Sequence, residues 1–222
     1  DSFYDEWRRR LPAAETHYLA DAGHYVLMDA ADEQLTATYE EDNQDLWTED
    51  VFEVFLWTDE RHPVYFEYEI SPLGHELPLM VPNVDGTFYG WIPWHYEGER
   101  RTRRATTILG GERASGARIT GWRAEVFIPY ALLAPLSNVP PRTGTRWRAN
   151  FYRLDYDGAT PSGWHWAPVG STFHEFERFG TLEPAAVAAA DPEEFATLCS
   201  TPPAVHRFPG SMAARVFCSM AR

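Results

Sequence analysis

The sequence predicts an all-β protein, a two-sheet antiparallel β-sandwich of the jelly-roll or immunoglobulin-like kind with few short helices. Three observations support this class: short segments alternate apolar and polar residues, turn residues separate them, and long helical patterns are scarce. A chain of 222 residues can form one domain with a substantial core. We assign residues 1–183 to the sandwich, with strands from residue 17 onward, and residues 184–222 to an Ala-rich appendage that is partly helical or disordered.

Two neighbouring segments, residues 51–57 and 64–70, give the strongest strand signal. Each alternates apolar and polar residues, and a short turn joins them. A period of two over neighbouring runs indicates an antiparallel pair with one face on a core. The opposite face then carries the carboxylates of Glu53, Glu67 and Glu69 beside aromatic rings, which is unusual for a purely structural surface.

The other strands are expected on both sides of this pair. The same alternation predicts strands over residues 121–129 and 146–155, and further strands are expected over residues 24–30, 35–40, 104–109 and 176–182. A helical turn is expected directly after Pro129. Residues 71–90 contain three prolines and the turn sequence NVDG, so we expect a loop-rich stretch there.

The charge of the chain argues against several classes of partner. The formal net charge is −14, and all 19 basic residues are arginines. Such a field repels the phosphate backbone of nucleic acids and anionic membrane surfaces, so we expect neither as a partner. No apolar run is long enough to span a membrane. The two cysteines, Cys199 and Cys218, have no metal-binding spacing.

Six segments in order resemble the family 9 carbohydrate-binding modules. They read LWTEDVFEVFL, YFEYEISPLG, GWRAEVFIPYALL, WRANFYRLD, WHWAP and FHEFERFGTLE. The resemblance covers residues 24–183 and implies a β-sandwich related to the DOMON group, sugar binding, often structural calcium, and no catalysis. It also implies an oligo- or polysaccharide partner, an extracellular or periplasmic location, and a place in a larger polysaccharide-processing protein.

The resemblance further implies an aromatic clamp for one sugar. Trp47 matches the first clamp ring, just before the acidic strand, and Phe173 stands where the family has its second ring. A pyranose has apolar C–H faces and a rim of hydroxyls, so two flat rings can cover its faces. Phenylalanine in place of tryptophan keeps a stacking face but loses area and the indole donor.

The same resemblance implies polar contacts at the rim of the clamp. Glu53 matches the acidic residue that binds sugar hydroxyls, and Tyr152 matches a polar ligand two residues after Asn150. Asn150 shares the polar side of that strand and joins the predicted site. Glu69 stands where the family has a basic ligand, a difference that leaves the type of sugar open.

Simpler interpretations and other functions remain open at this point. Trp47 and Phe173 could be core aromatics, and Glu53 could pair with an arginine in a structural network. One alternative function is a haem-binding DOMON-like electron-transfer module, for which Met28 and Met80 are available. Another is a glycoside hydrolase that uses paired carboxylates. No nucleophile motif supports hydrolysis, so we expect no enzyme.

An acidic loop at residues 40–45 is the candidate metal site. Hard cations such as calcium prefer oxygen ligands, and Glu41, Asp42 and Asp45 would supply them. Structural calcium is the one cofactor that we expect. The loop lacks the glycine of a helix–loop–helix calcium site, and a solvated acidic turn explains the same residues equally well.

Overall fold

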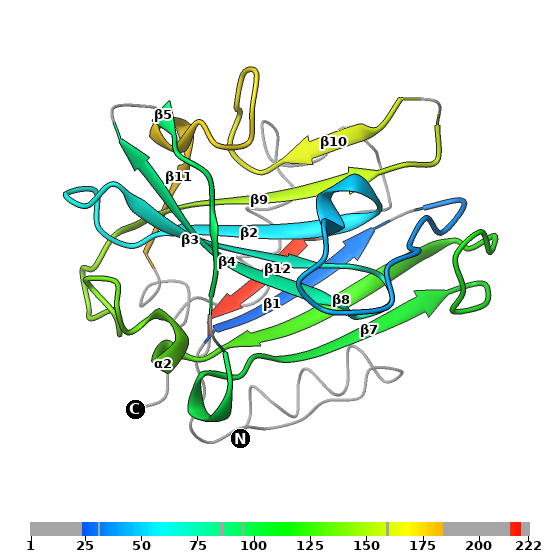
Figure 1. The fold of residues 1–222 in the computed structure, drawn as a ribbon, viewed down its shortest axis with the longest axis horizontal. Coiled ribbons are helices and arrows are strands. Elements are labelled where there is room, and N and C mark those ends of the chain that lie inside the picture. The colour runs from blue at the N-terminus through cyan, green and yellow to red at the C-terminus, as the bar shows by residue number, and fades with distance from the viewer. Residues whose placement is uncertain are drawn as a thin grey trace.

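The computed structural model describes residues 24–30, 32–84, 87–94, 96–158, 160–183 and 214–218, and it confirms the all-β class with two antiparallel sheets (Figure 1). The smaller sheet has the strand order β12–β1–β8–β7, from Ala214–Cys218, His24–Ala30, Gly121–Ile128 and Arg103–Leu109. The larger sheet has the order β10–β9–β2–β3–β4–β5, from Ser162–His165, Trp147–Asp155, Val51–Trp57, Val64–Ile70, Glu76–Val84 and Thr87–Phe88.

Short elements complete the larger sheet and its connections. Strand β6, Ile92–Pro93, pairs with β4, and strand β11, Gly180–Leu182, pairs with β9. The helical segments are η1 (Leu46–Thr48), η2 (Gly98–Arg100), α2 (Tyr130–Leu133) and η3 (Phe176–Arg178). Within the described residues, no helix has the length and apolar character needed to cross a membrane.

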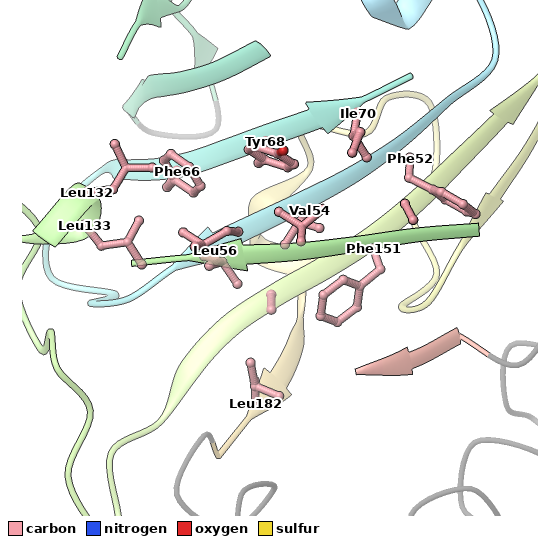
Figure 2. Packing of buried hydrophobic residues seen from close by; sticks show 14 of the residues in the cluster. Phe52, Val54, Leu56, Phe66, Tyr68, Ile70, Leu132, Leu133, Phe151 and Leu182 are labelled. Carbon is pink, nitrogen blue, oxygen red and sulfur yellow. The ribbon is translucent and has the colours of Figure 1, made fainter. Parts of the chain in front are cut away.

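The core lies between the two sheets and confirms the predicted sides of the strands. In Figure 2, Phe52, Val54 and Leu56 of β2 point to the same side as Phe66, Tyr68 and Ile70 of β3. Strands β8 and β9 contribute large residues to the same cluster, including Trp122, Val126, Trp147 and Phe151. Glu53 faces away from this core, as its place between Phe52 and Val54 predicts.

The opposite face of the larger sheet is buried as well, which the alternation did not predict. Every residue of β2 is buried. A second cluster on this face packs aromatic residues from β2, β3, β9 and the segment around η3: Phe55, Trp57, Tyr65, Tyr152, Phe176 and Phe179. The loops that come from later in the chain therefore cover the carboxylate-bearing face.

Strand β4 corrects the prediction of a loop-rich stretch over residues 71–90. It contains Pro78 and Pro82, which normally argue against a strand. The carbonyl groups of these prolines accept hydrogen bonds from Trp94 and Tyr89 at 2.8 and 3.3 Å, on the side away from β3. The missing N–H groups lie on that same side, where only the short strands β5 and β6 pair, so the ladder with β3 is intact.

Three other segments differ from the expected pattern. Residues 35–40 form no strand, and residues 176–182 divide into η3 and β11. Strand β12 pairs with β1, so a part of residues 184–222 lies at the edge of the smaller sheet, although the sequence predicted an appendage. The rest of that stretch, with its expected helical part, lies outside the described residues.

Arg104 of β7 links the two sheets through an ion-pair cluster. Its Nη2 lies 2.7 Å from Oδ1 of Asp42, and its guanidinium also pairs with Glu76 of β4, whose side chain is fully buried. The hydroxyls of Tyr68 and Thr102 donate to Glu76 at 2.6 and 2.5 Å. The buried charge of Glu76 thus has one cation and two hydroxyl donors.

We expect Arg104→Met to lower the free energy of unfolding by about 3–5 kcal/mol, because it leaves the Glu76 carboxylate buried without its cation. Urea denaturation measures the change. The matched control is Arg101→Met, at an exposed position near the start of the same strand, which should stay within about 0.5 kcal/mol of the parent. Equal losses in the two variants would show that the ion pair contributes nothing special.

Candidate functional site

A pocket of about 290 Å³ opens on the second face of the larger sheet. Its floor comes from β2, β3, β4 and β9, and its walls come from η1, the segment before β6 and the loop before η3. The lining residues are Trp47, Glu53, Phe55, Glu67, Glu69, Leu79, Trp91, Leu154, Thr172, Phe173 and His174. Segments that lie far apart in the sequence therefore build one concave site.

Trp47 and Trp91 form one aromatic wall of the pocket. The short η1 turn presents Trp47, while its neighbour Leu46 is buried beneath. The Tyr156 hydroxyl donates to the Trp47 carbonyl at 2.6 Å and fixes that turn. The two indole rings meet edge to face, with centroids 5.0 Å apart and an interplanar angle of 69°. Trp91 remains 45% exposed, so this wall continues to the molecular surface.

Phe173 forms another part of the pocket wall and is held from two sides. Its ring stacks on Tyr152 with centroids 4.0 Å apart and an interplanar angle of 13°. The Tyr152 hydroxyl donates to the Phe173 carbonyl at 2.8 Å. The Glu175 carboxylate accepts the backbone N–H groups of Gly170 and Ser171 at 2.7 and 2.8 Å, and these bonds hold the pKa of Glu175 at about 2. These hydrogen bonds hold the loop of residues 170–175 together within the chain itself.

Three carboxylates form the floor, and all are buried. Glu53 on β2 lies opposite Glu69 on β3, and Glu67 lies one step along the same face. Their exposed fractions are 3%, 1% and 5%, respectively. Burial raises the pKa of Glu67 to about 8. Burial and mutual repulsion raise the pKa values of Glu53 and Glu69 well above the usual range. The floor therefore exchanges protons with solvent near neutral pH.

These carboxylates have few internal donors. The backbone N–H of Trp47 donates to Glu69, and Glu67 and Glu69 share a hydrogen bond. Oε2 of Glu67 and Oε2 of Glu69 have no hydrogen-bond partner. A buried carboxylate oxygen normally has a donor, so these two atoms are unsatisfied polar groups in the floor of the pocket.

His174 completes the pocket as a neutral side chain. Its Nδ1 lies 2.5 Å from the Tyr65 hydroxyl and 3.8 Å from Oε2 of Glu67. Burial lowers the pKa of His174 to about 4, so the ring carries no charge near neutral pH. No described residue of the lining is an arginine. The charge that the pocket presents near neutral pH is therefore zero or negative.

The structure brings four of the sequence-predicted residues to this pocket and places two beneath it. Trp47, Glu53, Glu69 and Phe173 line the cavity. Asn150 and Tyr152 are 0% and 1% exposed and do not line it. They support the wall instead, because Asn150 Nδ2 donates to the Tyr152 hydroxyl at 2.7 Å, and Tyr152 in turn holds Phe173.

Sequence reasoning did not assign Glu67, Trp91 and His174 to the site. Glu67 shares the face of Glu53 and Glu69, so the period-two pattern contained enough information to include it. Trp91 and His174 come from irregular segments whose position depends on contacts distant in the sequence. No local pattern could have placed them next to Trp47 and Glu67.

Neither candidate calcium site offers a set of free oxygen ligands. Glu41 and Asp45 are exposed, and both oxygens of Asp42 accept hydrogen bonds from Arg104 at 2.7 and 2.8 Å. A second group, Asp32, Asp155 and Asp157, brings carboxylate oxygens within 4.8 Å of one another. Here Arg153 binds Asp32 and Asp155, each at 2.8 Å.

Backbone donors occupy the remaining oxygens of that second group. Oδ1 of Asp32 accepts the N–H of Gln34, and Oδ1 of Asp155 accepts the N–H of Asp157. The two oxygens of Asp157 accept the N–H groups of Glu33 and Gln34. Arginine and amide donors thus occupy the oxygens of Asp42 and of the whole second group, so neither acidic group presents three free carboxylates to a calcium ion.

Comparison with known proteins identifies relatives of the chain. In the curated set, the protein of Arthroderma benhamiae named "Extracellular protein" is 28% identical over 141 residues, 60% of this chain and 59% of that protein. A cis-3-alkyl-4-alkyloxetan-2-one decarboxylase from Shewanella oneidensis is 50% identical over 34 residues, 15% of this chain and 11% of the enzyme. The chain therefore spans less than two thirds of each curated relative's length.

A solved structure shows the same fold. The crystal structure of a candidate carbohydrate-binding protein from Bacteroides uniformis matches with a TM-score of 0.53 and 20% identity, and the match covers 72% of this chain and 73% of that one. The sequence profile of carbohydrate-binding family 9 matches residues 16–184, which include every segment that lines the pocket. The chain belongs to carbohydrate-binding family 9.

Proposed function

We propose that this chain is a non-catalytic module that binds one sugar ring of an oligo- or polysaccharide between Trp47 and Phe173. The observation that carries the proposal is the joining of aromatic walls and a carboxylate floor in a single pocket. Stacking rings suit the C–H faces of a pyranose, and carboxyl groups suit its hydroxyls. Membership of carbohydrate-binding family 9 supports the same conclusion.

The size of the pocket favours one enclosed sugar and an exposed continuation. At about 290 Å³ the cavity is at the lower end of ligand sites, which span roughly 300–1,000 Å³. Near Trp91 the chain exposes further large apolar side chains, with Tyr89 at 64% and Ile92 at 58%. A neighbouring sugar unit that leaves the pocket on this side would lie against them.

The carboxylates suit binding better than hydrolysis. A glycoside hydrolase needs one carboxyl group protonated and its partner ionised, so the two environments must push the pKa values apart. Here burial raises the pKa values of Glu53, Glu67 and Glu69 together. For the haem alternative, Met80 is packed in the core between the sheets, away from the pocket.

A location outside the cytoplasm fits this function. The A. benhamiae relative is named an extracellular protein, and a polysaccharide ligand is met there. We infer an extracellular or periplasmic location for this chain and a place within a larger polysaccharide-processing protein. Expression of the natural full-length protein with a localisation assay would check both inferences.

We expect Trp47→Ala to lower sugar affinity about ten- to hundredfold, because one stacking ring contributes about 1–3 kcal/mol. Calorimetry with a soluble oligosaccharide measures the change, and a thermal melt reports on the fold. Trp164→Ala is the matched control, since this half-buried tryptophan of β10 does not line the pocket. Unchanged affinity in Trp47→Ala would place the binding slot elsewhere.

The calcium prediction can be checked by melting the protein in calcium and in chelator. Calcium that binds only the folded chain would raise the midpoint by linkage. Because arginine and amide donors already occupy the oxygens of Asp42 and of the group of Asp32, Asp155 and Asp157, we expect the two midpoints to agree. A higher midpoint in calcium would show that the folded chain binds the cation.

We expect the free energy of unfolding to fall as the pH rises from 6.5 to 8. Burial raises the pKa of Glu67 to about 8, so the folded chain binds more protons than the unfolded chain in this window. His174, with its pKa lowered to about 4, acts in the opposite sense only below about 6.5. Each proton changes stability by up to about 1.4 kcal/mol per pH unit.

Glu69→Gln tests whether the pocket carboxyl groups cause this pH dependence, because it removes one carboxylate from the floor. Its stability should fall less between pH 6.5 and 8 than that of the parent, as urea midpoints at both pH values would show. Glu112→Gln removes an exposed charge from the turn between β7 and β8 and should keep the parent's dependence. The same dependence in all three proteins would locate the titration outside the pocket.

A further inference from the structure

The pocket concentrates acidic side chains without a basic partner. Glu53, Glu67 and Glu69 are each at least 95% buried, and none of the described lining residues is an arginine. Glu67 and Glu69 line this space, and each has one buried oxygen without a hydrogen-bond partner. A buried carboxylate without a counter-charge is costly, so the pocket favours a ligand that brings positive charge and hydrogen-bond donors.

The floor and walls of the pocket favour an organic cation over a small metal ion. Among the described residues, the group of three whose carboxylate oxygens converge within 4.8 Å is Asp32, Asp155 and Asp157, and the three glutamates of the pocket do not form such a group. The walls are aromatic rings, which attract organic ammonium groups through their π faces and stack on sugar rings. A larger organic cation therefore suits the site better than a bare ion.

We propose that the preferred ligand is a protonated amino sugar, whose ammonium group binds Glu67 and Glu69 while its ring lies between Trp47 and Phe173. This inference rests on the proposed sugar binding and adds the ligand's charge to it. The ammonium has three N–H donors, enough to reach both unpartnered oxygens. Glu53 then remains for the ring hydroxyls.

We therefore expect an N-acetylated sugar or a sugar without nitrogen to bind more weakly than the protonated amino sugar. Acetylation removes the charge and adds bulk at the nitrogen, and a hydroxyl in place of the amine supplies no positive charge to an ionised carboxylate. A cation also lowers the pKa of nearby carboxyl groups, so its binding should release protons to solvent. A neutral sugar that accepts the existing protonation state should release none.

Calorimetry on the full chain with three β-1,4-linked disaccharides tests the proposal. The probes are a glucosamine disaccharide, its di-N-acetyl form and cellobiose, which differ only at the second carbon of each ring. Titrations at pH 6.5 in two buffers of different ionisation enthalpy report the number of protons released. The other titratable side chains near the floor, Tyr65, Tyr152 and His174, are neutral at this pH, because burial raises the tyrosine pKa values and lowers that of His174 to about 4.

We expect the glucosamine disaccharide to bind at least tenfold more tightly than the other two and to release protons. Glu69→Gln should lower this affinity about tenfold, while Glu112→Gln should leave the affinities for all three disaccharides unchanged. If Glu69→Gln fails to fold in a thermal melt, Glu67→Gln takes its place. Cellobiose affinity equal to or above that of the glucosamine disaccharide overturns the amino-sugar proposal and leaves sugar binding intact. If none of the three binds, the proposed sugar site itself fails.

Discussion

The pairing register of β2 with β3 determines where every other feature of the molecule lies. It sets Phe52 against Ile70 on the core face and Glu53 against Glu69 on the pocket face. A slip of one residue would turn the carboxylates into the core and the aromatic rings into the pocket. Two buried acidic side chains directly opposite each other disfavour this pairing locally, so the packing of the core must hold it.

Much of the fold could be predicted because the alternation is local. The strands of the central pair, their core side and the acidic side all follow from neighbours in the sequence. Strand β4 could not be predicted, because its two prolines are tolerated only through the position of the sheet edge, which a sequence does not display. The burial of the second face also depends on a distant loop around η3 that folds back over the sheet.

Some residues of the candidate site could be predicted from the sequence, and others depend on contacts between distant segments. Trp47 and Phe173 came from a family resemblance, and the pocket brings them together. Asn150 and Tyr152 came from the same resemblance but lie below the pocket wall, where their side chains form a hydrogen-bonded chain to the Phe173 carbonyl. Which polar residue of a strand touches a ligand and which supports one depends on loop packing. Strand periodicity alone cannot separate the two.

Several carboxylates outside the pocket have arginine partners, whereas those at the pocket floor have none among the described lining residues. Arg153 accompanies Asp32 and Asp155, and Arg104 accompanies Asp42 and Glu76. These groups have their cations within the chain, as stable burial of charge requires. The pocket, between the same sheet and its covering loops, has three carboxylates and no arginine among its described lining residues. Arginine thus accompanies four carboxylates outside the pocket and none of the three at its floor, a difference that supports the proposal that a ligand supplies the positive charge there.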